Sequence, residues 1–563
     1  MIWSTIPNMK AKIKIRKYLN PTLIISILVF GLIVIAVTNN IKQKNGTLTC
    51  PNCNVILVSI DSLRPDHLST FGYSRATDPN LEKWSRNAAV FETYIATSYL
   101  TPISEMSLHT SLYPSESGVV NFSTKLIGNK QTLAEILKSF GYKTTAICSS
   151  PEFLFFLGIA PTTNNATSTK IESPLRKSFS RGFDEYCKEF DGYKFSGAGP
   201  SKELFVSKWQ DFSAPKYLRG LPMSTLGWLK ENRKEKFFLW LPIGTAHWPY
   251  NDQKPFHFAD EKYDGPLRET PLDWSIFSRI YENKILPQDK KGSSVSLNED
   301  DLKFLIDRYD DGLFLVDSFL GELFGALKEN GLDKNTIVVI ASEHGESLGE
   351  HGYIAHYDVL DTDIKVPLII KLPEVAGSRI RDQISSVDVL PTILDALEIP
   401  PPAQAEGASF LNSLTKKTSS SLSYAFIERI PLWENIIATT WRTYGNRQFT
   451  VEQGKAYDDF SQLDDKNHYR DIAVRTNKWK LIHRQSREVQ ERYSWWHILS
   501  GKEMKISEYE LYDLENDPNE TENVLDRYPE EAGLLKQKLA EWEENTQKRR
   551  PPIEQGPILQ PYF

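Results

Sequence analysis

Asn54-Val55-Ile56-Leu57-Val58-Ser59-Ile60 is a largely apolar run of strand length, and Asp61 follows it directly. Such a run suits a parallel strand that is covered on both faces. In open α/β sheets, functional groups gather just past the carboxyl ends of the strands. We therefore predict a buried strand at residues 54–60 and a role in metal binding or catalysis for Asp61.

Two further apolar runs deliver ionisable groups in the same way. Residues 237–243 lead into His247, and residues 336–341 lead into Glu343 and His344. Segments with helical spacing and a glycine stop lie between the runs, at residues 131–141 and 301–331. Alternation of strand and helix predicts an α/β fold. Three such runs predict one sheet whose edge carries a site.

Asp61, Glu343 and His344 together offer two carboxylates and an imidazole. Hard oxygen ligands favour calcium, magnesium or manganese, and an imidazole brings zinc within range. We predict that these three residues bind a divalent metal ion.

The segment from Ser98 to Pro114 contains the candidate nucleophile. Thr101 stands immediately before Pro102 and a run that reads as a short helix. Free N–H groups at a helix start form an anion site, and a cation beside the hydroxyl would lower its pKa. The alternative is that Thr101 only caps the helix.

Length, composition and charge set the class of protein. The 563 residues suffice for a large core and for more than one domain. Hydrophobic and charged contents of 40% and 25% are ordinary for a globular protein. The net charge of −7 gives no case for a nucleic-acid partner.

The N-terminus has a different character. Five basic residues between Lys10 and Lys17 precede an apolar run at residues 21–38, which is just long enough to span a bilayer. The basic flank stays cytoplasmic, and no small-x-small cleavage site closes the run. We expect a cytoplasmic segment at residues 1–20 and an uncleaved signal anchor at residues 21–38. The rest of this single-pass membrane protein would then be periplasmic or at the cell surface.

Four cysteines remain, and outside the cytoplasm they are able to pair. Cys50-Pro51-Asn52-Cys53 suits either a tight disulfide or a redox pair, while Cys148 and Cys187 stand further along the chain. A metal site would need a second closely spaced pair, and the sequence has none.

The remaining patterns divide the chain into parts. Residues 39–53 read as a polar tether, residues 54–413 as the catalytic domain, and the Ser-rich residues 414–423 as a linker. Residues 424–550 read as a C-terminal subdomain, with strands at residues 473–482 and 510–514 and an amphipathic helix at residues 529–546.

Short motifs follow one another in order across residues 54–530. They are Val58–Leu68 (VSIDSLRPDHL), Phe71-Gly72-Tyr73, Asp78-Pro79-Asn80-Leu81, Ser111-Leu112-Tyr113-Pro114, Gly141-Tyr142-Lys143-Thr144, Arg181-Gly182-Phe183-Asp184, Ala246–Tyr250 (AHWPY), Ala341–Glu346 (ASEHGE), Lys365-Val366-Pro367-Leu368, Val387–Thr392 (VDVLPT) and Leu511–Pro518 (LYDLENDP). Each motif alone is weak, but so many in order make a specific signal. Together they resemble the sulfatase family of the alkaline-phosphatase superfamily.

The resemblance implies a large N-terminal α/β domain with a mixed sheet, helices on both faces, and a smaller C-terminal α+β domain. It implies a metal ion, with calcium first, at Asp61, Glu343 and His344, and a nucleophile at Thr101. His247 matches a family histidine that contacts the substrate or protonates the leaving group.

Three additional residues are candidates for the site. His356 matches a histidine that many relatives carry in the same loop, and Ser62 and Arg64 lie in the motif that follows the first strand.

The sequence departs from the family pattern around the nucleophile. Where relatives carry a cysteine or serine that becomes formylglycine, an ungapped count from Tyr113-Pro114 places Thr101, so formylglycine is not expected. Pro102 follows directly, and Glu105 replaces the family arginine. Ser98 and Ser104 are alternative nucleophiles if the loop is shifted.

Other departures affect the metal ligands and a lysine. Ser62 stands for the second of a pair of aspartates, and Glu343 stands where aspartate is usual. Cys148-Ser149-Ser150 occupies the region of a lysine that often follows the Gly-Tyr motif.

The expected function is metal-dependent hydrolysis of sulfate or phosphate esters on a small molecule, a glycan or a lipid headgroup. One alternative is a transferase of phosphoethanolamine or phosphoglycerol groups, because relatives with a threonine nucleophile perform such transfers. Another is a non-catalytic binder of sulfated or phosphorylated glycans, which the changes at Glu105 and Ser62 motivate.

Overall fold

The computed structural model describes a discontinuous set of residues. These are residues 48–120, 124–148, 174–187, 221–248, 250, 256–268, 297–352, 354–356, 358–414, 423–429, 470–485 and 507–550. They all belong to one compact unit, residues 48–563. The expected anchor at residues 21–38 lies outside them. Among the helices that the structure does describe, none combines the length and apolar character that a bilayer crossing requires.

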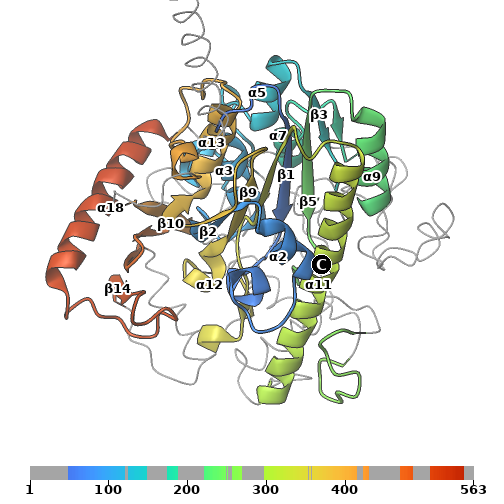
Figure 1. Cartoon of the computed structure of the whole chain (residues 1–563). Coiled ribbons are helices and arrows are strands. Elements are labelled where there is room, and N and C mark those ends of the chain that lie inside the picture. The colour runs from blue at the N-terminus through green and yellow to red at the C-terminus, as the bar shows by residue number, and fades with distance from the viewer. Residues whose placement is uncertain are drawn as a thin grey trace, which may run out of the picture. The chain divides into compact units, whose positions relative to one another are not determined.

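A mixed sheet forms the centre of the unit (Figure 1). β9 runs antiparallel to both of its neighbours, whereas the other pairings in the sheet are parallel. The α/β mixed sheet predicted from the sequence is therefore confirmed. In spatial order its strands are β10 (Ser378–Ser385), β2 (Ala89–Ile95), β9 (Lys365–Lys371), β6 (Thr336–Ala341), β1 (Asn54–Ile60), β5 (Phe237–Ile243), β3 (Lys143–Ala146) and β4 (Glu185–Tyr186).

Helices cover both faces of this sheet. Val55 and Leu57 of β1 belong to the core beneath α3 (Thr101–Thr110), α5 (Leu133–Ser139), α7 (Pro174–Phe179) and α13 (Val389–Ala396). Ile56 and Val58 belong to the core beneath α2 (Pro79–Ser85), α9 (Leu221–Asn232) and α11 (Glu299–Glu329).

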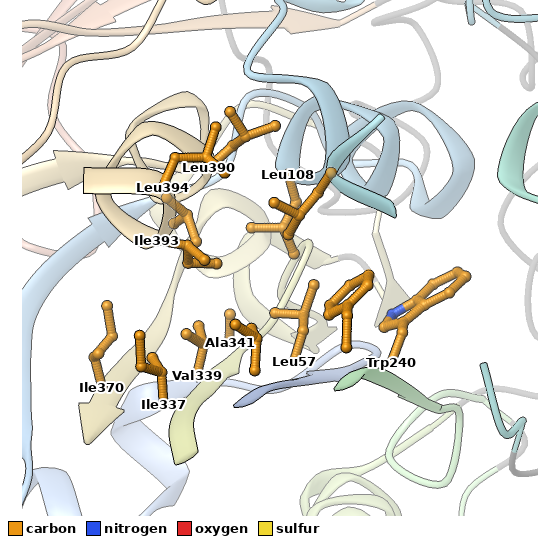
Figure 2. Packing of buried hydrophobic residues seen from close by; sticks show 14 of the residues in the cluster. Leu57, Leu108, Trp240, Ile337, Val339, Ala341, Ile370, Leu390, Ile393 and Leu394 are labelled. Atoms are coloured by element: carbon orange, nitrogen blue, oxygen red, sulfur yellow. The ribbon is translucent and has the colours of Figure 1, made fainter. Parts of the chain in front are cut away.

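This alternation explains why the β1 sequence is apolar throughout, since both of its faces are buried. Figure 2 shows the first core, in which Leu57 and Trp240 lie below Leu108 of α3 and Ile393 of α13. Each such side chain contributes about 1.5–3 kcal/mol when fully buried.

The helix boundaries follow from capping residues. The side chain of Asn298 accepts a hydrogen bond from the Asp301 backbone N–H at the start of α11, and Thr132 does the same for Glu135 in α5. Gly141 and Gly331, after these two helices, have φ values of +82° and +68°, which favour glycine. The predicted helices at 131–141 and 301–331 are thus observed with ends within two residues.

A second, antiparallel sheet forms the C-terminal part. Its strands in order are β11 (Ala425–Arg429), β12 (Asp471–Arg475), β13 (Trp479–Arg484) and β14 (Tyr509–Asp513). α18 (Pro529–Arg549) packs on one face through Leu535 and Leu539, and the other face packs against the main domain near Ile364. The predicted single strand at residues 473–482 is wrong: the chain turns back at residues 476–478, and β12 pairs with β13.

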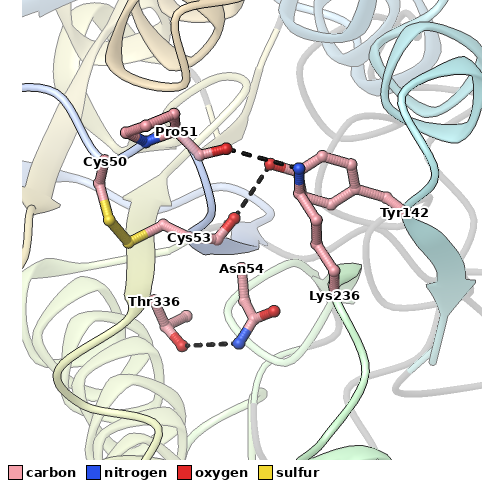
Figure 3. The surroundings of a disulfide bond; sticks show 7 residues. All are labelled: Cys50, Pro51, Cys53, Asn54, Tyr142, Lys236 and Thr336. Atoms are coloured by element: carbon pink, nitrogen blue, oxygen red, sulfur yellow. Dashed lines mark hydrogen bonds between the residues drawn. A yellow bond between two sulfur atoms is a disulfide. The ribbon is translucent and has the colours of Figure 1, made fainter.

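Both cysteine pairs form disulfides. Cys50–Cys53 closes a tight loop just before β1, and Cys148–Cys187 joins the ends of the neighbouring strands β3 and β4. Near the first disulfide, the Tyr142 hydroxyl donates to the Cys53 carbonyl at 3.0 Å (Figure 3). Of the two possibilities raised for Cys50 and Cys53, the structure has the disulfide.

Candidate active site

One edge of the main sheet gathers the predicted site residues. β1 lies between β5 and β6, with Ile60 opposite Ile243 and Ser59 opposite Ala341. Parallel strands in this register end side by side, so the residues that follow them converge. Asp61 follows β1, while Glu343 and His344 follow β6.

Asp61, Glu343 and His344 form a compact buried group. One ligand atom from each lies within 4.8 Å of the others, and all three side chains are buried. His344 Nε2 lies 3.2 Å from Asp61 Oδ1. The three residues predicted as metal ligands are therefore brought together.

The hydrogen bonds of this group leave acceptors facing one another. His344 Nδ1 lies 2.9 Å from the Gly345 carbonyl, which can only accept, so Nδ1 carries the proton and Nε2 presents a lone pair. Asp61 Oδ2 and both Glu343 carboxylate oxygens are buried without a hydrogen-bond partner among the described residues. Buried acceptors that meet without a donor fit a divalent cation.

Electrostatics agree with this interpretation. Burial, and then the negative charges of Asp61 and Glu105, raise the pKa of Glu343 well above its ordinary value. Burial lowers the pKa of His344, against the opposing effect of Asp61. Burial favours the neutral imidazole of His344, which is the form that binds a metal ion, whereas the Glu343 shift reflects a pocket that lacks compensating positive charge. A bound cation would supply that charge.

Thr101 opens α3 directly beside this group. Its hydroxyl oxygen Oγ1 lies 2.9 Å from His344 Nε2, and the side chain is fully buried. The N-cap is Leu100, without a side-chain capping bond, and Thr101 is the first helical residue. The alternative that Thr101 is the helix cap is therefore wrong, because the cap is the preceding residue. The Thr101 hydroxyl points to the ligand group instead.

The two other serines considered as nucleophiles lie differently. Ser98 Oγ donates to the Glu428 carbonyl at 2.8 Å, on the side of the C-terminal sheet. Ser104 Oγ is buried and has no hydrogen-bond partner among the described residues. Among the described residues, the hydroxyl of Thr101 contacts a predicted metal ligand, and those of Ser98 and Ser104 do not.

His247 and His356 face each other next to the ligand group. Their Nε2 atoms are 3.1 Å apart, and the ring centroids of His344 and His356 are 4.0 Å apart. His247 Nδ1 is hydrogen-bonded to the Trp248 carbonyl, so that nitrogen carries a proton. Burial, and then the nearby His344 and His247, lower the pKa of His356 well below its ordinary value.

Ser62 connects the ligand group to Glu346. Its Oγ lies 3.2 Å from Asp61 Oδ1 and 3.0 Å from Glu346 Oε2, and its φ of 60° is a left-handed value that is uncommon for serine. Tyr309 holds this turn by donating its hydroxyl hydrogen to the Ser62 carbonyl at 2.7 Å. Ser62 therefore positions Asp61.

Arg64 lies nearby but its guanidinium has other partners. It pairs with Asp66 at 2.6 Å and with Glu350 at 2.8 Å, and it donates to the Glu346 carbonyl at 2.9 Å. These contacts fix the loops after β1 and β6 to each other. Of the additional candidates, Arg64 thus supports the site from outside.

Glu346 and Tyr250 were not selected from the sequence as site residues. The Tyr250 hydroxyl donates to Glu346 Oε1 at 2.8 Å, and burial raises the pKa of Glu346 well above its ordinary value. Both residues belong to motifs quoted above, so membership in those motifs is the sequence signal by which they could have been selected.

Comparison with known proteins places this arrangement in a family. The sulfatase family model matches residues 53–399, more than half of the chain. The chain belongs to the sulfatase family. The prediction of a sulfatase-type ester hydrolase in the alkaline-phosphatase superfamily is thereby confirmed at the level of the family.

Two curated relatives illustrate the range of the family. The chain is 24% identical over 411 residues to the multifunctional alkaline phosphatase superfamily protein PehA of Trinickia caryophylli, which covers 64% of this chain and 77% of that protein. It is 23% identical over 553 residues to the N-acetylglucosamine-6-O-sulfatase of Bacteroides thetaiotaomicron, covering 88% and 86% of the two chains.

A solved structure shows that the fold extends over most of the chain. The phosphonate monoester hydrolase of Agrobacterium radiobacter superimposes with a TM-score of 0.61 at 19% identity, covering 88% of this sulfatase-family chain and 96% of that one. At this identity, the likeness establishes the fold. The mixed sheet and the smaller C-terminal sheet described above are the parts of that fold.

Proposed function

We propose that this protein hydrolyses sulfate esters, or the closely related phosphate and phosphonate esters, with Thr101 as the nucleophile and a divalent metal ion at Asp61, Glu343 and His344. The observation that carries the proposal is the 2.9 Å contact between Thr101 Oγ1 and His344 Nε2 at the edge of the buried ligand group. The sulfatase, phosphatase-superfamily and phosphonate hydrolase names of the relatives support this range of substrates.

A cation bound by Asp61, Glu343 and His344 would supply positive charge that lowers the pKa of the Thr101 hydroxyl and neutralises the substrate oxygens. The chain's own residues account for the rest of the chemistry. Thr101 Oγ1 attacks the sulfur or phosphorus atom and its hydroxyl proton passes to solvent, while the ester S–O or P–O bond breaks and the alcohol leaves with a proton from His247. Water then attacks the same atom, the bond to Thr101 Oγ1 breaks, and the water's protons restore the threonine hydroxyl and His247 as sulfate, phosphate or phosphonate is released.

His247 is the group we assign to the leaving alcohol. Its Nδ1–H is fixed by the Trp248 carbonyl, so Nε2, which contacts His356 Nε2 in this structure, is the nitrogen that would pass a proton to the leaving alcohol. General acid catalysis of this kind typically contributes 10²- to 10⁴-fold in rate. His356, at 3.1 Å from that Nε2, holds the ring in place.

Thr101→Ala and Thr101→Ser test the nucleophile. Thr101→Ala should lower turnover by several orders of magnitude with substrate binding nearly unchanged, because it removes a transition-state role. Thr101→Ser should keep part of the turnover, because the hydroxyl survives. Turnover should be measured on aryl sulfates, phosphomonoesters, phosphodiesters and phosphonates. Wild-type turnover in Thr101→Ala would rule out this nucleophile.

We also propose that residues 21–38 anchor the enzyme in a membrane, with the catalytic domain outside the cytoplasm. The basic cluster from Lys10 to Lys17 and the apolar run that follows support this topology. Cell fractionation with N-terminal sequencing tests it. A mature chain that begins near residue 39 or later contradicts the anchor.

A further inference from the structure

One face of α3 carries three buried polar residues in a row. Thr101, Glu105 and His109 are spaced four residues apart, so they lie above one another on the same side of the helix. All three are buried. Residues four apart on a helix have Cβ atoms about 5–6 Å from each other, so Glu105 lies one turn from Thr101.

His109 holds Glu105 in this position. His109 Nε2 lies 3.1 Å from Glu105 Oε1, and the imidazole packs edge-on against Trp240 with a centroid distance of 4.4 Å. The other carboxylate oxygen of Glu105, Oε2, is buried and has no hydrogen-bond partner among the described residues. One oxygen is therefore fixed, and the second has no hydrogen-bond donor among the described residues.

Glu105 lies close to the ligand group through Thr101. It is one helical turn from Thr101, whose Oγ1 contacts His344 Nε2 at 2.9 Å. Glu105 does not belong to the set of groups whose ligand atoms lie within 4.8 Å of one another. It therefore does not serve as a direct ligand in this arrangement.

A buried carboxylate oxygen without a donor destabilises the protein unless a cation or water satisfies it. A cation bound at the neighbouring ligand group would satisfy this oxygen electrostatically.

We propose that Glu105, oriented by His109, is an outer carboxylate of the cation site, which strengthens binding of a divalent metal ion at Asp61, Glu343 and His344 without coordinating it. This positioning role rests on the proposed function, because it presupposes that those three residues bind the ion. Carboxylates and imidazoles behind direct ligands orient them and raise their affinity for the metal.

Glu105→Gln tests the proposal by metal titration of the metal-stripped protein. Calcium, magnesium, manganese and zinc are each added alone, and the dissociation constant is measured by calorimetry. We expect Glu105→Gln to weaken binding about 10- to 100-fold. His109→Gln should weaken it in the same direction but less. Glu116→Gln, which changes a buried glutamate paired with Arg549, serves as the matched control and should leave affinity unchanged.

Thermal unfolding in chelator separates this role from a structural one. Without metal, Glu105→Gln should be at least as stable as the wild type, because it removes an unsatisfied buried charge. Lower stability in chelator together with unchanged metal affinity would show that Glu105 is only structural and would overturn the proposal.

Asp61→Asn distinguishes failure of this inference from failure of the proposed function. If the wild type binds metal and Asp61→Asn does not, the metal site is sound, and wild-type affinity in Glu105→Gln then overturns the role of Glu105 alone. If the wild type binds none of the four ions, both proposals fail.

Discussion

Buried carboxylates occur in two regions of this protein, and the two regions treat them in opposite ways. At the edge of the main sheet, Asp61 and Glu343 have carboxylate oxygens without hydrogen-bond donors among the described residues. Beneath the C-terminal sheet, basic side chains pair with the buried acids. Arg484 contacts Asp358 at 2.6 Å and Glu510 at 3.1 Å.

The pairing extends along the C-terminal strands. Arg470 contacts Glu428 at 2.7 Å, and Lys480 contacts Asp361 at 2.9 Å. Burial would raise the pKa of Asp358, but the guanidinium groups of Arg484 and Arg429 outweigh burial and hold it well below its usual range. At Glu343 the pKa moves upward instead.

The difference teaches how to recognise a site among buried charges. A paired carboxylate needs nothing further, so its role is to fix one strand or loop to another. A buried carboxylate without a hydrogen-bond donor is destabilising unless a ligand satisfies it. The chain therefore uses similar residues as structural connections in one sheet and as a cation cradle at the edge of the other.

Arg484→Met breaks the paired region and should have the largest effect. The substitution leaves Asp358, Asp471 and Glu510 buried without this guanidinium. Removing one partner of a buried ion pair typically destabilises a protein by about 3–5 kcal/mol. Chemical denaturation followed by circular dichroism measures this change.

An exposed pair provides the control for that experiment. Arg527 contacts Glu522, and both side chains are 58% exposed. Water and salt screen such a pair, so Arg527→Met should barely change the midpoint of unfolding. Equal losses of stability in Arg484→Met and Arg527→Met would show that burial does not determine how much these ion pairs stabilise the protein.

Asp61→Asn changes the group of carboxylates without donors, and its effect on stability should depend on metal. In chelator, the variant should be no less stable than the wild type, because it removes a charge that faces other acceptors. With a divalent ion at about 100 times its dissociation constant, the wild type should gain about 2.7 kcal/mol and the variant should gain nothing. Paired melting curves with and without metal measure both quantities. An equal metal-induced shift in the variant would remove Asp61 from the metal site.

The sequence predicts the site well where local patterns and strand order coincide. Asp61, Glu343 and His344 stand directly after apolar runs, and parallel strands carry such residues to one edge. The neighbouring positions of β1 and β6 then bring the three together. The α/β architecture follows from the same alternation of runs and helical segments.

Other features depend on contacts that a local pattern does not contain. β9 carries Pro367, a residue that argues against a central strand, so its place between β2 and β6 is not apparent from the sequence. The turn at residues 476–478 has no glycine, and the two strands around it read as one. Tyr250 and Glu346 meet only because two loops 96 residues apart fold onto the same edge.

Asp317 on α11 shows a third way to satisfy a buried carboxylate, and it gives the smallest and sharpest test. Its oxygens accept from the Leu81 N–H at 2.8 Å and the Asn80 N–H at 3.0 Å, at the start of α2. Burial nevertheless raises the pKa of Asp317 to about 6, against the effect of these donors. Backbone donors therefore compensate this carboxylate less fully than the guanidinium groups compensate Asp358.

The sign of the pH dependence follows from this raised pKa. The folded protein holds the Asp317 proton more tightly than the unfolded chain, whose pKa is near 3.8. The contribution to stability is thus complete below about pH 4 and is lost as the pH rises through about 6. Asp317→Asn does not titrate, so the wild type should lose stability relative to this variant between pH 4 and pH 7. Denaturation curves across that range measure the difference, with the exposed Asp526→Asn as a control for net charge. Parallel stability profiles for the wild type and Asp317→Asn would mean that the donors of α2 compensate the carboxylate as fully as an arginine does.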